Sequence, residues 1–182
     1  NSVRNCGGIM SYTYSKIASY TIGSGGTKDI NFLAIPQNYT DLKIVISARQ
    51  DSAGYYTYPY MYLNGNYDNY TWKDVYAESS TPGSQAGNLY YMGYIPGPSA
   101  TANTFGNAEY YFPNYSSNKY KSMSYEAVSE NNSSTATQWI LDFGGYTWQN
   151  TAPITSIGFY VSASRVFSQY TTITIYGIKA EV

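Results

Sequence analysis

The sequence predicts an all-β protein, an antiparallel two-sheet β-sandwich of the jelly-roll kind. Apolar and polar residues alternate along most of the 182-residue chain, which is the period of half-buried strands. Clusters of Gly, Pro and Asn interrupt these runs at short intervals, and no stretch carries a helical apolar stripe. Tyr, a strand former, occurs 24 times. This pattern predicts about ten or eleven short strands.

The four clearest strands have a parity that predicts which side chains point into the core. A slip of one residue would turn a whole set outward, so parity carries the prediction. The segments are "DLKIVISAR", "QWILDFGG", "SIGFYVS" and "TTITIYGI". Their predicted inward residues are Leu42, Ile44 and Ile46; Trp139, Leu141 and Phe143; Ile157 and Phe159; and Ile173 and Ile175.

Weaker alternation predicts the remaining strands. They are expected at residues 12–22, 28–33, 58–63, 70–78, 88–94, 108–112 and 119–128. Asn64-Gly65 is the favoured pair for a type I′ hairpin turn and predicts a tip there. Three long connections rich in small residues are predicted as loops, at 50–57, 79–87 and 95–107. Such loops on a rigid scaffold often carry binding residues.

Residues 10–182 are predicted to form the β-sandwich domain, with residues 1–9 as an extended arm or linker. The arm carries the single cysteine, Cys6, beside Gly7 and Gly8. One cysteine allows no disulfide within the chain, so the core must hold the domain together. A flexible setting is also unlike that of an activated nucleophile, and we expect Cys6 to do no chemistry.

Charge and hydropathy exclude two classes of partner. Only 12% of residues are charged, and the formal net charge is −1. Nucleic-acid binding requires a concentrated field of Lys and Arg, which this composition does not provide. No apolar run approaches the roughly 20 residues that span a bilayer. The sequence therefore predicts no nucleic-acid partner and no membrane insertion.

The sequence predicts a protein that is not an enzyme and holds no cofactor. It contains no histidine, which removes the usual Ser-His-Asp and Cys-His centres and the commonest zinc ligand. Carboxylates remain: Asp74 with Glu78, and Glu126 with Glu130, share strand parity. Four residues along a strand cover about 13 Å, whereas a glycosidase pair requires roughly 5–9.5 Å.

Calcium is the one metal for which the sequence offers oxygen ligands. Asp51 and the stretch 66–69 place carboxylates and amides in loops. Their spacing matches no known calcium loop, and Asx turns explain the same residues. We therefore predict no metal site.

Several blocks resemble a known family. They are "YSKIASYTIGS", "INFLAIPQNYTDLKIVISAR", "YLNGN", "SATANTFGNAEYYFPNYSSNKYKSMSYEAVSENN", "ITSIGFYVSAS" and "FSQYTTITIYGI". Together, over residues 12–178, they resemble a family of tailed-phage virion proteins: β-sandwich domains described as tail-fibre-like or structural, found in marine and other environmental phages. The resemblance implies a virion component, assembled in the host cytoplasm and exposed on the particle, with other virion proteins as partners. It also implies a homo-oligomer, most simply a trimer.

Two functions remain open on this resemblance. The first is an adsorption or receptor-binding module that contacts a host-surface polysaccharide. The second is a capsid decoration protein or fibre subunit whose Tyr-rich faces meet only other subunits. A glycan-binding module of a secreted enzyme would fit the composition but not the resemblance.

The candidate glycan site is the stretch "DSAGYYTYPYMYLNGNYDNYTW", residues 51–72. Rings can cover a sugar face, and neighbouring short polar side chains can bind its hydroxyl groups. An outer sheet face or a subunit interface would explain the same rings at least as well. The candidate residues are Tyr55, Tyr56, Tyr58, Asn66, Tyr67, Asp68, Asn69 and Trp72.

Overall fold

Antiparallel strands make up the regular structure of the chain, as the alternation predicted. The computed structural model describes residues 13–78, 80–88, 91, 93–131, 138–162 and 164–179. The described residues contain no helix, and so none that could cross a membrane. The strands are β1 (Thr13–Thr21), β2 (Asp29–Phe32), β3 (Asp41–Ala48), β4 (Tyr56–Thr57), β5 (Tyr60–Leu63), β6 (Tyr70–Glu78), β7 (Thr81–Gly87), β8 (Ile95–Pro96), β9 (Gly106–Phe112), β10 (Lys121–Ser129), β11 (Ile140–Trp148), β12 (Ile157–Tyr160) and β13 (Thr172–Lys179).

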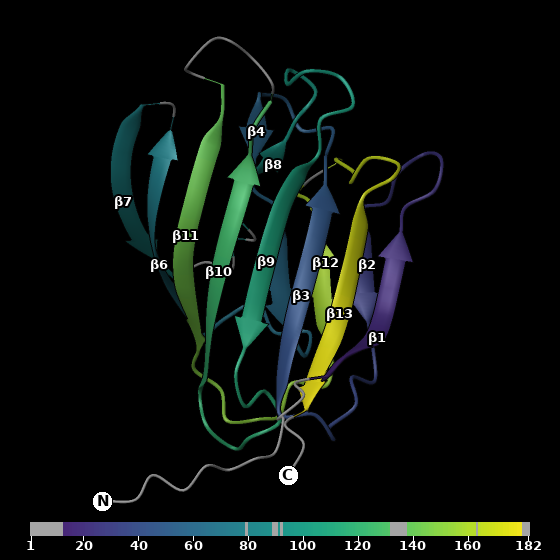
Figure 1. Cartoon of the computed structure of the whole chain (residues 1–182), viewed down its shortest axis with the longest axis vertical. Coiled ribbons are helices and arrows are strands. Elements are labelled where there is room, and N and C mark those ends of the chain that lie inside the picture. Colours follow the sequence, from purple (N-terminus) through teal and green to yellow (C-terminus); the bar gives the residue numbers. More distant parts are fainter. Residues whose placement is uncertain are drawn as a thin grey trace, which may run out of the picture.

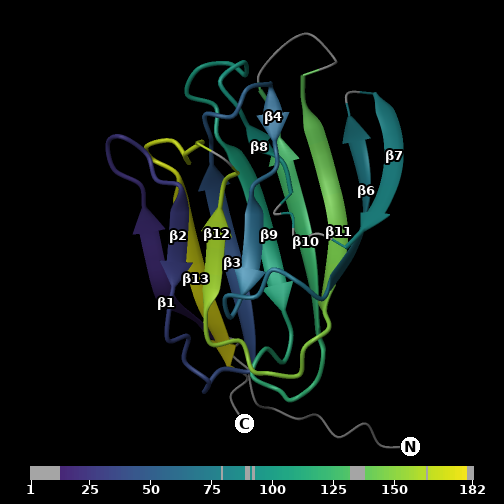
Figure 2. The same ribbon diagram turned by 180° about the vertical axis from the view of Figure 1, so that it is seen from behind.

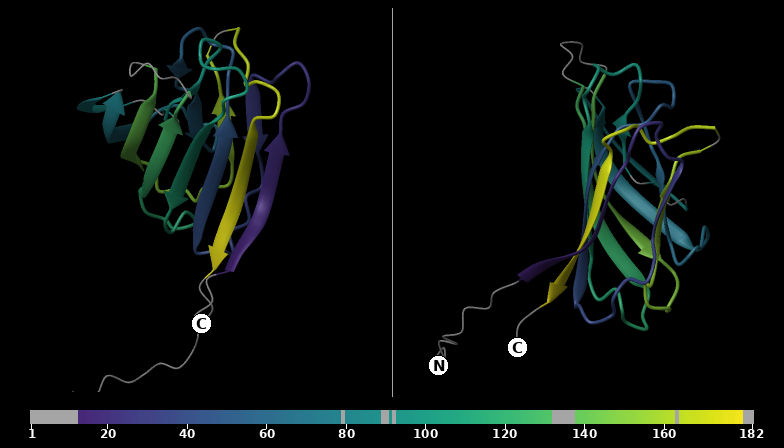
Figure 3. Two further views of the ribbon diagram at one scale, coloured as in Figure 1. Left: turned by 45° about the horizontal axis from the view of Figure 1, so that its top comes forward. Right: turned by 90° about the vertical axis from the view of Figure 1, so that its right-hand side faces the viewer.

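The strands form two layers and a short ribbon. The large sheet has the order β1-β13-β3-β9-β10-β11-β6-β7 and fills the front of Figure 1. The small sheet, β2-β12-β5, lies behind it, with β2 and β12 toward the viewer in Figure 2. An edge-on view shows the two layers facing each other (Figure 3, right). The ribbon β4-β8 lies at one end, the top of Figure 1.

Side chains from both layers fill the space between them. Leu42, Ile44 and Ile46 on β3 are fully buried, as their parity predicted. The same holds for the predicted residues of the other two confirmed strands, Ile157 and Phe159 on β12 and Ile173 and Ile175 on β13. Burial of such residues is the main favourable contribution to the stability of a β-protein without disulfides.

The predicted inward face of β11 was wrong. Ile140, Tyr146 and Trp148 point inward, whereas Phe143 is 43% exposed and Trp139 and Leu141 are only partly buried. Both parities of this segment carry apolar residues, so alternation did not choose between them. The two large rings after Gly144-Gly145 occupy the core, and every residue between them and Ile140 must follow their parity.

The predictions for two neighbouring segments were also wrong, because the strand lies where a loop was expected. Residues 79–87, expected as a loop, include β7, which pairs with β6 along the edge of the large sheet. Residues 88–94, expected as a strand, contribute a single bridge between Tyr91 and Tyr60 in the part that is described. The small residues of β7 pack against large rings on β6: a Cβ added to Gly83 would lie 2.4 Å from the Tyr76 ring.

The predicted type I′ turn at Asn64-Gly65 is confirmed, but it does not close a hairpin of two paired strands, because β5 and β6 lie in different sheets. Both residues have positive φ, 52° and 70°, as a type I′ turn requires, and the amide of Asn66 donates to the Leu63 carbonyl at 2.9 Å. This turn joins β5 to β6. The predicted arm, residues 1–9 with Cys6, lies outside the described residues.

The loops around β4 and β8 are joined to one another by backbone hydrogen bonds. The amide of Gly97 donates to the Tyr55 carbonyl at 3.0 Å, and that of Ser99 donates to the Gly54 carbonyl at 3.1 Å. Residues 164–170 lie beside them, since the amide of Asp51 donates to the Val166 carbonyl. We call this cluster of loops, residues 49–59, 94–105 and 164–171, the loop end.

Candidate functional site

Eight tyrosine rings, each in contact with the next, form a row along one side of the molecule. Tyr60 on β5 stacks on Tyr160 of β12, with centroids 4.8 Å apart and planes at 16°. Tyr160 contacts Tyr62, and Tyr67 lies 4.8 Å from Tyr62. In the other direction, Tyr58 joins Tyr60. We call this set the tyrosine row; in order along it, its members are Tyr56, Tyr94, Tyr58, Tyr91, Tyr60, Tyr160, Tyr62 and Tyr67.

The middle of the row lies on the outer face of the small sheet. Tyr62 and Tyr160 alternate with inward residues of their strands, so their rings point away from the core. Gly158 makes this packing possible, because a Cβ there would lie 2.1 Å from the Tyr62 ring. The Tyr62 hydroxyl crosses the sheet and donates to Asn31 Oδ1 at 2.7 Å.

At the loop end the row opens into a hollow of about 460 Å³. We call it the tyrosine hollow. Strands β4, β5 and β6 contribute rings to it, and β7 contributes Gln85. It is lined by Ser52, Tyr56, Thr57, Tyr58, Tyr60, Tyr76, Glu78, Gln85, Tyr94, Ile140 and Ser162. A volume of this size accommodates a sugar unit or a short oligosaccharide.

The hollow carries neutral donors beside one carboxylate. The Tyr56 hydroxyl donates to Glu78 Oε1. Burial, together with this bond, raises the pKa of Tyr56, and burial also raises the pKa of Tyr94. Both phenols therefore stay protonated at neutral pH. The surface offers aromatic faces and hydroxyl donors next to the carboxylate and amide oxygens of Glu78 and Gln85.

A buried polar cluster lies beside the hollow. The Tyr125 hydroxyl donates to Asp142 Oδ1 at 2.6 Å and lies 3.2 Å from Asp74 Oδ2, which also accepts from Gln85 Nε2 at 3.0 Å. The hydroxyl has one proton, so it donates to one carboxyl group at a time, and the shorter distance favours Asp142. Burial raises the pKa of Asp142 to about 7 and raises that of Asp74. Burial therefore favours the neutral, protonated form of both carboxyl groups.

Gly93 closes this cluster off from solvent. It has φ +70°, and a Cβ there would lie 2.6 Å from the Ala127 Cβ and 3.7 Å from Asp142 Oδ2. Asp142 is only 1% exposed. The search for carboxylate pairs within one strand did not find these two residues, because Asp74 on β6 and Asp142 on β11 are brought together by the Tyr125 hydroxyl of β10.

The structure brings together only part of the predicted glycan site. Tyr56 and Tyr58 line the tyrosine hollow, and Tyr58 is 38% exposed. Tyr55 is also exposed at the loop end but does not line the hollow.

The other predicted residues lie elsewhere. Residues 64–69 sit against the connection after β11, at the bottom of Figure 2, where the Gln149 amide donates to the Asn69 carbonyl at 2.8 Å. Tyr67 still belongs to the far end of the row, through Tyr62. Trp72 is only 7% exposed and points between the layers, where its ring contacts Tyr91. It is therefore not available to a surface ligand.

Asp51, Asn66 and Asp68 have structural partners. The amide of Asp68 donates to Asn66 Oδ1 at 2.7 Å, which is an Asx turn. Asp51 Oδ1 accepts from the Val166 amide at 2.7 Å. Within the described ranges, no group of three or more acidic or cysteine side chains is arranged to hold a metal ion.

The sequence did not identify Tyr76, Glu78, Gln85 and Tyr94 as residues of the hollow. They follow the predicted stretch in the chain, and the pairing of β6 with β7 brings Gln85 beside it. Proximity in the sequence was the only available criterion, and it cannot detect this pairing. Comparison with known proteins found no matching family model, no matching curated protein and no matching solved structure.

Proposed function

We propose that this chain is a non-enzymatic phage virion protein, an adsorption module that binds host-surface glycan through the tyrosine hollow. The virion assignment rests on the family resemblance of residues 12–178. The tyrosine hollow is the observation that favours glycan binding. Rings contributed by three strands and a loop meet there around polar oxygens, which is the surface that a sugar requires.

Sugar binding at this site uses both the aromatic rings and the hydrogen-bonding groups of the hollow. The C–H faces of a pyranose pack on aromatic rings, and its hydroxyl groups exchange hydrogen bonds with Glu78, Gln85 and the phenols. Ring-to-ring contacts, such as Tyr58 with Tyr91 at 4.3 Å, hold the rings before a ligand arrives. This preorganisation reduces the entropy lost on binding.

Replacing Tyr58 with Ala should weaken oligosaccharide binding by about tenfold or more, as expected when a central aromatic contact is removed. The measurement is a glycan array, followed by titration calorimetry with the best neutral ligand. The control is Tyr120→Ala, because Tyr120 is 62% exposed in the connection between β9 and β10, away from the hollow. Equal affinity in wild type and Tyr58→Ala, or equal loss in both variants, would contradict the proposed site.

A second function, a decoration or fibre subunit, is favoured by an exposed apolar patch. On the outer face of the large sheet, Phe143 pairs with Val75, and Leu141 pairs with Val128. Val75 is 59% exposed. A shallow hollow of about 590 Å³ lies here, lined by Lys73, Asp74, Val75, Ser84, Gln85, Ala86 and Phe143. Contiguous exposed apolar residues are typical of protein contacts.

In that role the protein should form a homotrimer whose contacts include this patch. Phe143→Glu should then convert the assembly to monomer, because a charge buried without a partner opposes association. Light scattering coupled to size-exclusion chromatography measures the change. Ser122→Glu is the control, since Ser122 is an exposed residue of the same sheet on β10. A monomeric wild type at high concentration would contradict trimer formation.

We also propose that the two layers form a jelly-roll-like sandwich. Early strands of the chain pair with later ones: β1 with β13, β2 with β12 and β3 with β9. A long hairpin wrapped around a barrel gives this nesting, in which β1 and β13 lie in the large sheet and β2 and β12 in the small one. The large sheet extends beyond it through β10, β11, β6 and β7.

A further inference from the structure

Arg49 is held at the loop end by three backbone carbonyls. Its Nη1 donates to Thr101 and Thr104, each at 2.9 Å, and its Nη2 donates to Ala100 at 3.1 Å. Arg49 directly follows β3, so these bonds attach the loop before β9 to the end of that strand. The guanidinium therefore has a fixed position and plane.

The positive charge of Arg49 has no carboxylate partner among the described residues, where the ion pair is Lys43 with Glu109. Carbonyl groups use three of the five guanidinium N–H donors, which leaves Nε–H and one N–H of Nη2. Two parallel N–H donors of a guanidinium match the two oxygens of a carboxylate.

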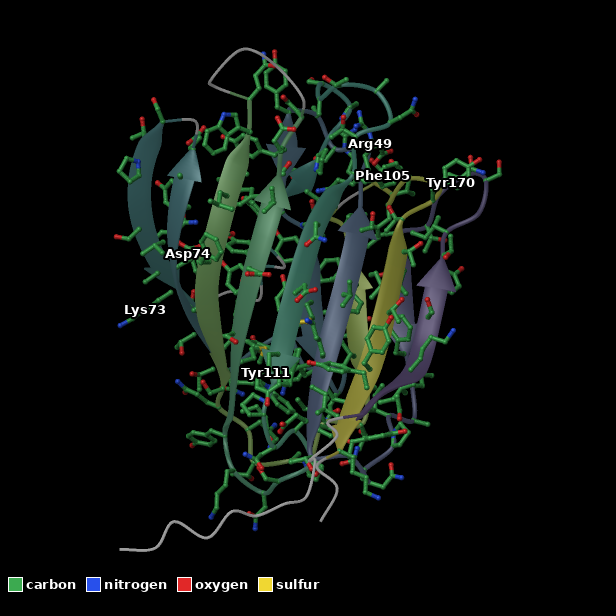
Figure 4. All side chains as sticks on the ribbon, in the orientation of Figure 1. Arg49, Lys73, Asp74, Phe105, Tyr111 and Tyr170 are labelled. Carbon is green, nitrogen blue, oxygen red and sulfur yellow. The ribbon has the colours of Figure 1, made fainter. Side chains whose placement is uncertain are left out.

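The guanidinium borders a small hollow at the loop end. Its volume is about 230 Å³, close to that of one sugar ring, and we call it the arginine hollow. Figure 4 shows Arg49, Phe105 and Tyr170 close together there. Tyr170 is 68% exposed. The lining residues are Arg49, Asn103, Phe105, Ser168, Gln169 and Tyr170.

Two residues of this hollow have positive φ, a conformation that Asn adopts readily but Tyr does not. Tyr170 has φ 71° and Asn103 has φ 64°. Positive φ is costly for a tyrosine, and such residues gather at ligand sites. The exposed ring of Tyr170 and the positive charge of Arg49 border the same hollow. Tyr170 is therefore not a core residue whose packing would require this conformation.

We propose that the arginine hollow binds the carboxylate of an acidic saccharide, a uronic acid unit. The two remaining guanidinium donors take the carboxylate oxygens, Tyr170 and Phe105 cover the apolar sugar face, and Asn103 and Gln169 bind hydroxyl groups. The saccharide part of this inference rests on the proposed function; the anion part rests on Arg49.

The position of the arginine hollow extends the proposed glycan surface. Arg49 and Ser52, which lines the tyrosine hollow, are three residues apart. Both hollows are therefore at the loop end. The acidic unit of a host glycan would then be selected by the arginine hollow.

The test is titration calorimetry of the whole protein at low salt with tri-galacturonic acid and with its methyl ester. The ester keeps the ring and removes the charge. Wild type should bind the acid about tenfold more tightly than the ester, as expected for a charge-assisted bidentate contact. Arg49→Gln should abolish this preference. Equal affinity of wild type for acid and ester would overturn the inference.

Two variants separate binding from structure. Arg165→Gln removes the same charge at the same end, where Arg165 Nη1 contacts the Asp51 carbonyl at 3.3 Å, and should leave the preference intact. Equal loss in both arginine variants would indicate unspecific attraction and overturn the inference. Tyr170→Asn suits positive φ and should weaken the acid several-fold without loss of stability. Full acid binding by Tyr170→Asn would overturn the role of the ring.

Failure of this inference differs from failure of the proposed function. If wild type showed no preference for the acid but still bound neutral glycans, only the proposed role of the arginine hollow would be refuted. A protein that binds the acid but no neutral glycan would keep the arginine hollow and refute the tyrosine hollow.

Discussion

The Trp148→Ala variant should lose about 3–5 kcal/mol of its free energy of unfolding, the usual range for a fully buried large ring. Trp148 is completely buried, and its ring stacks on Tyr70 with centroids 6.3 Å apart. Among the described residues its indole nitrogen has no hydrogen-bond partner, so the loss contains no broken hydrogen bond to that part of the protein. Chemical denaturation followed by tyrosine fluorescence gives the value.

The control is Phe143→Ala on the same strand. Phe143 points outward, and its removal should cost about 1 kcal/mol, since partly exposed side chains contribute less. The pair of variants tests the face of β11. If Phe143→Ala proved the more damaging of the two, the inward face of β11 would be that of Phe143, as alternation first indicated.

Stability should fall as pH rises from about 4 to about 7. Asp142 has an ordinary pKa of 3.8 and a pKa of about 7 in the folded protein, because burial disfavours its charged form. Between these values the folded state binds more protons than the unfolded state. Raising the pH therefore favours unfolding, by about 2–4 kcal/mol across the window.

Asp142→Asn should flatten this dependence, because the amide cannot ionise and still accepts the Tyr125 hydroxyl proton. Denaturant titrations at several pH values between 4 and 8 provide the comparison. Asp68→Asn is the control, since Asp68 is exposed in the tip between β5 and β6. Stability that is constant or rises over this range in wild type would contradict the raised pKa of Asp142.

Much of the fold could be predicted from local pattern. Strands β3, β12 and β13 have apolar residues at one parity dense enough to settle which face is buried. The Asn64-Gly65 tip followed from the φ angles that only such residues adopt readily. In each case the physical cause lies within a few neighbouring residues, so the sequence alone was sufficient.

Alternation failed where the cause lies further along the chain. On β11 both parities carry apolar residues, and the inward face was decided by the two rings beyond Gly144-Gly145. β7 was missed because its small residues carry no alternation, and only the rings of β6 give them a place.

The candidate site depended still more on tertiary structure. Tyr56 and Tyr58 were predicted from a dense run of rings, but Tyr76, Gln85 and Tyr94 reach the same hollow only through strand pairing and loop contacts. Tyr125 brings Asp142 and Asp74 together from two strands, and the path of the loop before β9 brings the Ala100 carbonyl to Arg49. Composition determined that this protein would be rich in aromatic and neutral polar surface. Which of those side chains face one another was decided by long-range pairing, because alternation specifies two faces of a strand but not its neighbours.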